Sequence, residues 1–214
     1  MLENRSFRDI GPFGNNIFLV TDPDTRETAV LDVGFEPERV VERIEKDGLR
    51  VRWLLATHAH YDHVAAMLPV QKRVGGAFAL HAEDLPLLER VALQGSMFGL
   101  PPADVPVVGL ELADGMRIPL GAQFLDVLHT PGHAPGHVTF RHGSTVWSGD
   151  VLFKGSIGRT DLPGASHEVL LRTIRERLFP LGDDVQVLCG HGPATTMGEE
   201  RRGNPFVGEA AGLR

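Results

Sequence analysis

Short apolar runs alternate with polar turns near the start of the chain, which is a pattern typical of strands. The runs Asn16 to Thr21 and Thr28 to Val33 flank the turn-forming residues Asp22-Pro23-Asp24. Apolar and β-branched side chains on both sides of a turn rich in Asp and Pro predict two paired strands. We therefore expect a β-hairpin in this region.

A segment with the apolar spacing of a helix follows the hairpin. Between Glu36 and Asp47, the apolar residues Val40, Val41 and Ile44 recur at the spacing of one helix face. Gly48 stands just past this segment, where a glycine commonly ends a helix. The segment is therefore predicted to be an amphipathic helix.

The mostly apolar run Val51 to Ala56 predicts a buried strand. It ends directly before a histidine-rich segment, and α/β proteins usually carry their functional groups at the C-terminal ends of strands. The pattern beyond it predicts a helix over Asp62 to Val74, a strand over Ala77 to Leu80, a helix over Asp84 to Leu93 and a loop over Gly95 to Pro106.

The second half is richer in strand-like runs, and no linker separates it from the first. It predicts strands over Phe124 to Leu128, Val138 to Phe140, Thr145 to Trp147 and Val185 to Cys189, and a helix from about Ser166 to Leu178. Two halves that each combine strands with helices predict a sandwich of two sheets with helices outside. Polar clusters at the strand ends place the expected site between the halves.

Composition mainly excludes classes of protein. The 214 residues are 42% hydrophobic, which suits one domain over residues 1–214 with a sizeable core. The net charge of −7 argues against nucleic-acid and anionic-membrane partners. No run has the length of a signal peptide or a membrane span. A single cysteine, Cys189, excludes an internal disulfide, so we expect a cytoplasmic protein; its oligomeric state is left open.

The segment Thr57 to His63 packs four potential metal ligands into six residues after the strand: His58, His60, Asp62 and His63. These side chains cannot all face one way on a helix or a strand, so a turn must gather them. Such a turn can serve two metal ions. Imidazole and carboxylate ligands without thiolate suit zinc, iron or manganese.

Three clusters in the second half supply further candidates. The loop His129 to His137 carries His133 and His137 among residues that force tight turns. Asp150 and His191 each follow a predicted strand, within Ser148-Gly149-Asp150 and Gly190-His191-Gly192-Pro193. Each cluster alone has an ordinary structural explanation, whereas their joint occurrence indicates a metal centre.

Together these motifs make the chain resemble the metallo-β-lactamase superfamily, and within it the short glyoxalase II-like hydrolases, over nearly its whole length. The resemblance implies an α/β fold of the αββα type, in which two mixed sheets are flanked by helices. Carried over position by position, it implies that His58, His60 and His133 bind one metal, that Asp62, His63 and His191 bind the other, and that Asp150 bridges both.

The same resemblance implies hydrolysis of a small-molecule thioester such as S-lactoylglutathione. Two divalent ions, with zinc expected and iron or manganese as alternatives, would lower the pKa of a bridging water toward about 7. Asp62 would orient the resulting hydroxide for attack on the thioester carbonyl. A free thiol has a pKa of about 8.5, so the thiolate can leave without a protein acid.

Three further residues are predicted near this centre, each with a structural alternative. His137 is expected to hydrogen-bond beside the metals, or to be an ordinary loop histidine. Asp32 matches a superfamily position close to the site, or forms a turn. Arg159 is expected to contact the substrate, or to pair with Asp161.

Two other functions stay open. The chain also resembles the persulfide dioxygenases, which share much of this motif set but use one iron. That resemblance implies an iron bound by His58, His133 and Asp150. A non-catalytic metal-binding module is the other alternative. The sequence also shows no C-terminal helical domain of the kind that grips glutathione in longer glyoxalase II enzymes, so the thiol carrier is left open.

Overall fold

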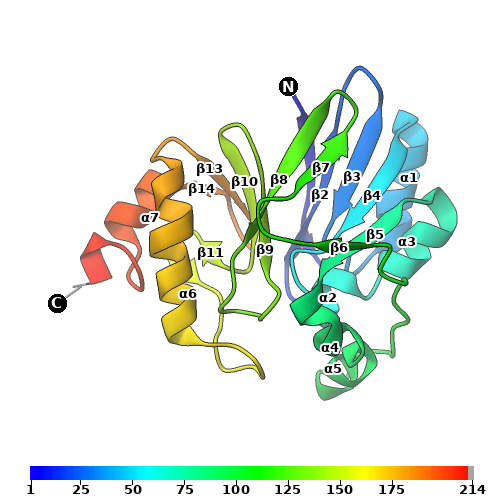
Figure 1. Cartoon of the computed structure of the whole chain (residues 1–214). Helices are drawn as coiled ribbons and strands as arrows, with labels where there is room; N and C mark the ends of the chain where they lie inside the picture. The colour runs from blue at the N-terminus through cyan, green and yellow to red at the C-terminus, as the bar shows by residue number, and fades with distance from the viewer. Residues whose placement is uncertain (212–214) are drawn as a thin grey trace.

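The computed structural model describes residues 1–211. Two sheets that face each other form the centre of the molecule (Figure 1). The first sheet takes its strands in chain order. They are β1 (Glu3–Ile10), β2 (Asn15–Thr21), β3 (Glu27–Leu31), β4 (Arg50–Leu55), β5 (Ala77–His81) and β6 (Leu110–Leu112). Strands β1 to β3 pair antiparallel, whereas β3 to β6 run parallel. The sheet is therefore mixed, as predicted.

The second sheet also has six strands, in the order β14-β13-β10-β9-β8-β7. They are β7 (Arg117–Leu120), β8 (Gln123–His129), β9 (Val138–His142), β10 (Thr145–Gly149), β13 (Gln186–Cys189) and β14 (Thr195–Thr196). Only β10 and β13 pair parallel. A small hairpin of β11 (Leu152–Phe153) and β12 (Ser156–Ile157) follows β10.

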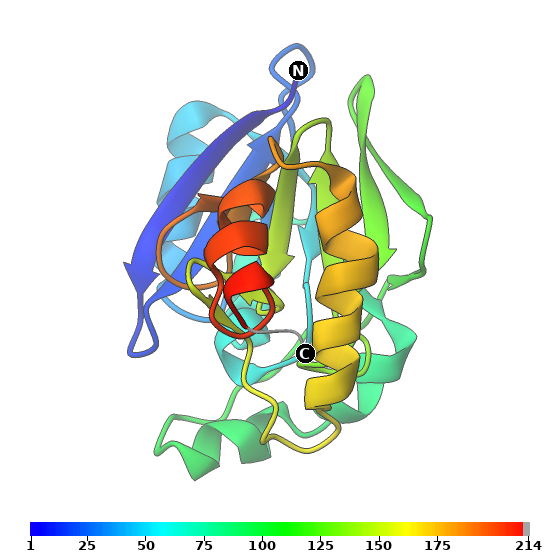
Figure 2. The same ribbon diagram turned by 90° about the vertical axis from the view of Figure 1, so that its left-hand side faces the viewer.

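Helices cover the outer face of each sheet, and this confirms the expected αββα arrangement (Figure 1). On the first sheet, α1 (Pro37–Asp47) and α3 (Met67–Val74) cover this face, while α2 (Tyr61–Val64), a 3₁₀ turn (Ala82–Asp84), α4 (Leu85–Leu88) and α5 (Val91–Met97) lie at one edge of the sheet. The second carries α6 (His167–Thr173), a π-helical turn (Ile174–Leu178), 3₁₀ turns (Phe179–Leu181 and Glu209–Ala211) and α7 (Met197–Gly203). Figure 2 shows α6 and α7 lying across the second sheet. Within residues 1–211, no helix is both long enough and apolar enough to span a bilayer.

Three buried apolar clusters hold the layers together. The central one lies between the sheets and includes Phe18, Leu31, Leu55, Phe140 and Trp147. A second packs α1 and α3 on the first sheet, and a third packs α6 and α7 on the other. Because burial of apolar surface is the main driving force of folding, these clusters fix the two sheets against each other and so fix the strand ends that meet between them.

Two predicted helices are broken in the structure. The segment Asp62 to Val74 divides into α2 and α3, because Pro69 lacks the N–H that a continuous helix would need to donate to Ala65. The break at Ala65-Ala66 places Pro69 in the first turn of α3. The predicted helix over Asp84 to Leu93 is a 3₁₀ turn followed by α4 and α5. Helix α5 continues to Met97, so the predicted loop from Gly95 begins too early.

Candidate metal centre

Seven residues, on loops or at the start of a helix, carry the predicted ligand side chains to one place at the edge of both sheets. His58 and His60 follow β4, while Asp62 and His63 stand on α2. From the second sheet, His133 comes from the β8–β9 loop, Asp150 follows β10 and His191 follows β13. The structure therefore brings together the seven side chains that the sequence motifs predict as ligands.

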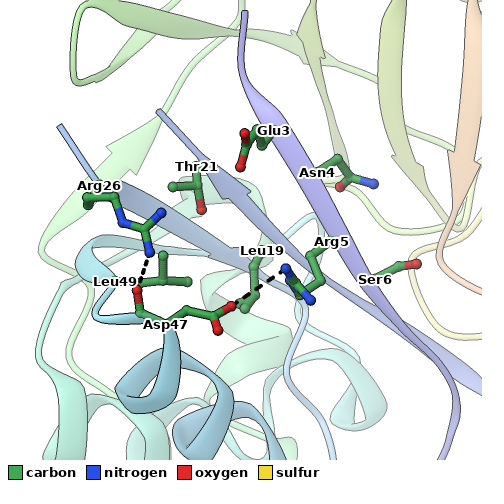
Figure 3. Close-up of a pocket in the computed structure, with 9 residues that line it drawn as sticks. All are labelled: Glu3, Asn4, Arg5, Ser6, Leu19, Thr21, Arg26, Asp47 and Leu49. Carbon is green, nitrogen blue, oxygen red and sulfur yellow. Dashed lines mark hydrogen bonds and ion pairs between the residues drawn. The ribbon is translucent and has the colours of Figure 1, made fainter. Parts of the chain in front are cut away.

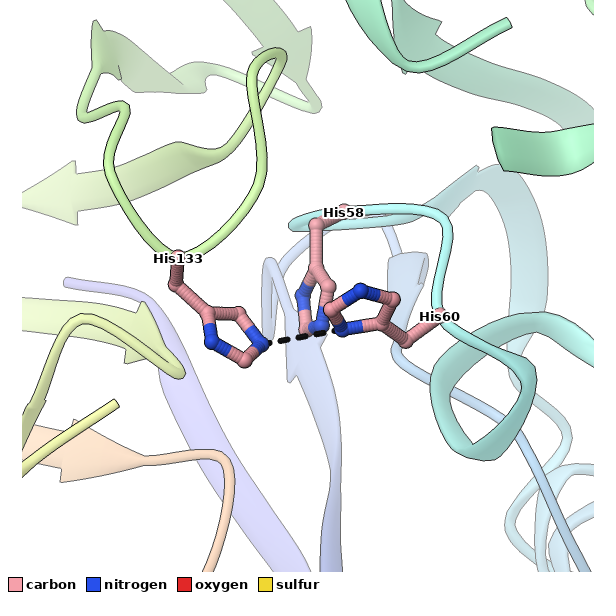
Figure 4. A group of neighbouring side chains, drawn as sticks. All are labelled: His58, His60 and His133. Carbon is pink, nitrogen blue, oxygen red and sulfur yellow. Dashed lines mark hydrogen bonds between the residues drawn. The ribbon is translucent and has the colours of Figure 1, made fainter. Parts of the chain in front are cut away.

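The first donor group consists of His58, His60 and His133, whose rings turn toward one another in Figure 4. One ring nitrogen from each residue lies within 4.8 Å of the other two. Nδ1 of His60 lies 2.9 Å from Nε2 of His133. Three buried imidazoles at this spacing match the donor set of one metal ion.

The second donor group consists of Asp62, His63 and His191, again with one donor atom from each within 4.8 Å of the others. Oδ2 of Asp62 lies 3.3 Å from Nε2 of His191 and 3.5 Å from Nε2 of His63. The ring centroids of His58 and His63 are 4.2 Å apart, so the two groups are direct neighbours.

Asp150 lies between the groups and faces both. Its Oδ1 is 3.4 Å from Nε2 of His63, and its Oδ2 is 3.3 Å from Nε2 of His191 and 3.7 Å from Nε2 of His133. Gly190 allows this approach, because a Cβ at that position would overlap Asp150 Oδ1. A carboxylate that faces two members of the second group and one of the first is suited to bridging two metals.

Unpartnered buried atoms support a metal at this place. Nε2 of His58, Nε2 of His63 and Oδ1 of Asp150 are buried and have no hydrogen-bond partner among the described residues. Leaving such polar atoms without a partner costs about 1–3 kcal/mol each. Coordination of a cation by these three atoms would offset this cost.

Electrostatics prepare the first group for coordination. Burial, together with the neighbouring histidines, lowers the pKa of His60 to about 3, and burial also lowers the pKa values of His58 and His133. Their rings are therefore neutral at pH 7 and have a lone pair to donate. Burial alone would raise the pKa of Asp150, but His63 and His191 hold it well below its usual range.

In the second group, neighbouring carboxylates favour the protonated form of the histidines. Burial alone would lower the pKa of His191, yet the carboxylates of Asp150 and Asp62 raise it to about 10. The same carboxylates raise the pKa of His63 well above its usual value against the effect of burial. A region that attracts protons so strongly will also attract a metal cation, which takes the place of those protons.

Backbone and side-chain groups orient the rings from behind. Nδ1 of His133 donates to the carbonyl oxygen of Arg159 at 2.8 Å, and Nδ1 of His191 donates to that of Phe13 at 3.0 Å. These bonds turn the Nε2 atoms into the centre. Asn15 Nδ2 similarly donates to Oδ2 of Asp62 at 3.0 Å. Such supporting contacts typically fix both the tautomer and the direction of a ligand.

Asp32 and His137 both lie against the predicted ligands. Oδ1 of Asp32 accepts from the backbone N–H of Thr57 at 2.8 Å, and its Oδ2 lies 3.3 Å from Nδ1 of His63. Nε2 of His137 accepts from the backbone N–H of Asp150 at 3.1 Å. Both side chains are buried. The structure thus places them as supports of the centre and not on exposed loops.

Asp84 belongs to the same scaffold, although no sequence signal marked it. Its Oδ2 accepts from the backbone N–H of Ala59 at 2.9 Å, and its Oδ1 accepts from that of Gly136 at 2.6 Å. It therefore ties the His58–His60 loop to the His133–His137 loop. Burial raises the pKa of Asp84 to about 6, although the two N–H bonds act in the opposite direction.

Comparison with known proteins identifies the family of the chain. The model of the metallo-beta-lactamase superfamily matches residues 10–191. The chain belongs to the metallo-beta-lactamase superfamily. The hydroxyacylglutathione hydrolase GloC of Haemophilus influenzae is 40% identical over 199 residues, which cover 91% of this chain and 93% of that protein.

Two crystal structures show how closely this superfamily member follows its relatives in three dimensions. TTHA1623 in a di-iron-bound form is 40% identical, with a TM-score of 0.87 over 94% of this chain and 99% of that one. The BLEG-1 B3 metallo-beta-lactamase is 34% identical, with a TM-score of 0.89 over 96% of this chain and 99% of that one. The fold is therefore shared along almost the whole chain.

A pocket of about 480 Å³ opens onto the donor groups of this metallo-beta-lactamase superfamily member. Its floor includes His60, Asp62, His133, Asp150 and His191. Arg159 also lines it, but Nε and Nη2 of Arg159 donate to the two carboxylate oxygens of Asp161, each at 2.7 Å. The structure thus shows Arg159 paired with Asp161, which was the alternative to a substrate contact, and places this pair beside the pocket.

A second hollow, of about 360 Å³, lies between β1, β2 and the end of α1 (Figure 3). Arg5 pairs there with Asp47 at 3.6 Å, and Arg26 donates to the backbone carbonyl of Asp47. The residues that line it include no histidine or cysteine. It offers an ordinary charged surface, so the pocket over the donor groups is the better candidate for a substrate site.

Proposed function

We propose that the protein is a binuclear metallo-hydrolase that cleaves a thioester such as S-lactoylglutathione. The observation that carries this proposal is the pair of three-donor groups with Asp150 between them. The name of the GloC relative adds support for the substrate class. Zinc is the expected metal, and iron is the main alternative because the TTHA1623 structure is described as di-iron-bound.

His58, His60 and His133 would hold one ion, and Asp62, His63 and His191 the other, with Asp150 in contact with both. When bound, two such ions supply an activated water at neutral pH and polarise the substrate carbonyl. The protein's own task is to hold the seven donors in place and to present the open side of the centre to the pocket.

Asp62 has a second task in this proposal. Its Oδ2 faces His191 and accepts from Asn15, which leaves Oδ1 free to accept a hydrogen bond from the attacking water. That bond would fix the direction of attack. No protein acid is required on the leaving side, because a thiol with a pKa of about 8.5 departs readily as its thiolate.

The alternatives leave parts of the structure without a role. A mononuclear iron dioxygenase would use His58, His133 and Asp150 and would not need the second donor group. A non-catalytic metal module would not need the pocket of about 480 Å³ over the donors. The hydrolase uses both features, and for that reason we favour it.

Thiol release from S-lactoylglutathione by metal-loaded protein tests this proposal. We expect release by the wild type and by Asp126→Ala, a carboxylate variant on β8 away from the centre. We expect its loss in Asp150→Ala, which removes the bridging group. No release by the wild type, accompanied by oxygen uptake with a glutathione persulfide, would contradict the hydrolase and favour the dioxygenase.

A further inference from the structure

The mouth of the substrate pocket is unusually apolar. Among residues 1–211, seven large hydrophobic side chains are exposed, and four of them line this pocket. They are Phe13 (40% exposed), Leu93 (61%), Met97 (72%) and Phe98 (50%). Isolated apolar residues on a surface need no explanation, whereas a contiguous group beside a candidate active site indicates a binding surface.

These side chains form one continuous wall. Leu93, Met97 and Phe98 come from α5 and the residue that follows it, while Phe13 comes from the β1–β2 turn on the other side. The rings of Phe13 and Phe98 meet edge to face, with their centroids 5.5 Å apart. Further into the pocket, Phe153, Ile157 and Leu162 continue the apolar lining.

Polar groups in the same wall are already used by the protein. Nε2 of Gln94 donates to the carbonyl oxygens of Ala59 and Leu87, and its Oε1 accepts from the N–H of Tyr61. The hydroxyl of Tyr61 donates to the carbonyl oxygen of Pro101 at 2.8 Å. These residues therefore present mainly carbon atoms to a ligand, and they offer few polar contacts.

Charge leads to the same conclusion. The guanidinium of Arg159 is paired with both carboxylate oxygens of Asp161, which already balance its charge. Arg90, the other arginine of the lining, is exposed to solvent. A highly charged carrier needs several complementary groups to replace its lost hydration. Phe13, Leu93, Met97 and Phe98 supply no such group, so they match an uncharged chain or ring within the substrate.

We propose that the substrate carries an apolar group of several carbons beside the scissile bond, and that Phe13, Leu93, Met97 and Phe98 bind this group. The inference rests on the proposed thioesterase function and specifies its substrate class. It leaves open whether the apolar group belongs to the acyl or the thiol part, because the wall borders the donor centre from both the α5 side and the β1–β2 side.

Two substrate series test the inference with the full-length, metal-loaded protein. One series comprises acetyl, butanoyl and hexanoyl thioesters of N-acetylcysteamine, and the other comprises acetyl thioesters of ethanethiol, butanethiol and hexanethiol. We expect kcat/KM to rise in at least one series by about two- to four-fold for each added methylene, the range that follows from transferring a methylene from water to an apolar surface.

A matched pair of variants assigns the effect to the wall. Leu93→Ser combined with Met97→Ser removes two side chains that are mostly exposed, so the core is untouched. We expect this double variant to lose most of the rise with chain length. Val107→Ser is the control, because Val107 is 89% exposed but does not line the pocket. It is expected to keep the full rise.

Each outcome separates the inference from the function beneath it. Thiol release that is independent of chain length in both series would overturn the apolar substrate class and leave the thioesterase standing. A rise that persists in the double variant would overturn the role of Leu93 and Met97. Absence of release from every thioester, including S-lactoylglutathione, would overturn the proposed function and the inference together.

Discussion

Asp84 accepts a hydrogen bond of 2.6 Å from the backbone N–H of Gly136, and this bond joins the 3₁₀ turn after β5 to the β8–β9 loop behind the donor centre. Its other carboxylate oxygen holds the N–H of Ala59, between His58 and His60. A single buried side chain thus sets the distance between two loops that supply the first donor group.

Replacement of Asp84 by alanine is expected to affect both stability and metal affinity. Two buried N–H groups would lose their acceptor, which predicts a loss of about 2–4 kcal/mol in the free energy of unfolding. Because the loops would separate, metal affinity should fall by about 10- to 100-fold. Urea unfolding and competition with a chelator measure the two effects.

The control for Asp84→Ala is Glu111→Ala, an exposed carboxylate on the neighbouring strand β6. It should change neither quantity appreciably. Normal metal affinity in Asp84→Ala, together with lowered stability, would show that Asp84 supports the fold alone and does not position the ligands.

His137 is predicted to act through the backbone of Asp150. The change His137→Phe keeps a ring of similar size but removes the acceptor for the Asp150 N–H. We expect kcat for thiol release to fall by about 10- to 100-fold with little change in KM, since the bridging carboxylate loses its support while the pocket is unaltered.

His142→Phe provides the comparison, because His142 faces the carbonyl oxygen of Phe124 on the second sheet, away from the centre. Its steady-state constants should match those of the wild type. A change in KM alone for His137→Phe would indicate a contact with substrate and would exclude the positioning role.

Asp22 links the two sheets and predicts a dependence of stability on acid pH. Its Oδ2 accepts from the N–H of Ala122 in the β7–β8 turn at 2.7 Å, and its Oδ1 accepts from the N–H of Asp24 at 2.9 Å. The bond from Ala122 is the main cause that lowers the pKa of Asp22 below its ordinary value of 3.8.

A folded-state pKa below the unfolded value means that ionised Asp22 stabilises the fold at neutral pH, and that this contribution is lost as the pH falls through 3.8 and below. The stability difference between wild type and Asp22→Ala should therefore be larger at pH 7 than at pH 3. Chemical unfolding at both pH values measures it. Asp24→Ala, which alters an exposed side chain, should have a small effect, and an equal difference at both pH values for Asp22→Ala would refute the linkage.

The candidate ligands could be recognised in the sequence because they occur in short, dense motifs directly after strand-like runs, and the family resemblance supplied their division into two groups. His58, His60, Asp62 and His63 lie within six positions, and the strand before them was recognisable from its apolar side chains. Because the strand ends meet between the sheets, His133, Asp150 and His191 come to lie beside these four residues.

Other parts carried no such local signal. Asp84 is predicted as the start of a helix, and only the tertiary structure shows that its carboxylate connects two loops.

Strand β1 was not predicted because it is an edge strand whose side chains are mostly exposed and charged, so it lacks a buried apolar face. The short strands β6, β7 and β14 are equally dependent on their partners in the sheets. Helix α7 went unpredicted too: it is capped by Thr196 and buries only part of its length.

The apolar wall of the pocket could not be predicted from the sequence either. Phe13 and Phe98 are 85 positions apart in the chain numbering, and their contact arises from the way the β1–β2 turn meets the end of α5. The partner of Arg159 likewise depends on the tertiary structure. The sequence offered a substrate contact or a pairing with Asp161; the side-chain geometry shows the pairing and places Arg159 in the pocket lining, while a contact with substrate stays a prediction.

The number of metal ions needed for full activity tests the two-site centre most directly. Metal-free protein would be titrated with zinc, and separately with ferrous iron, while thiol release and bound metal are measured together. Two donor groups that share Asp150 predict that activity rises until two ions per chain are bound. Full activity at one ion per chain, without a gain from the second, would contradict the binuclear hydrolase.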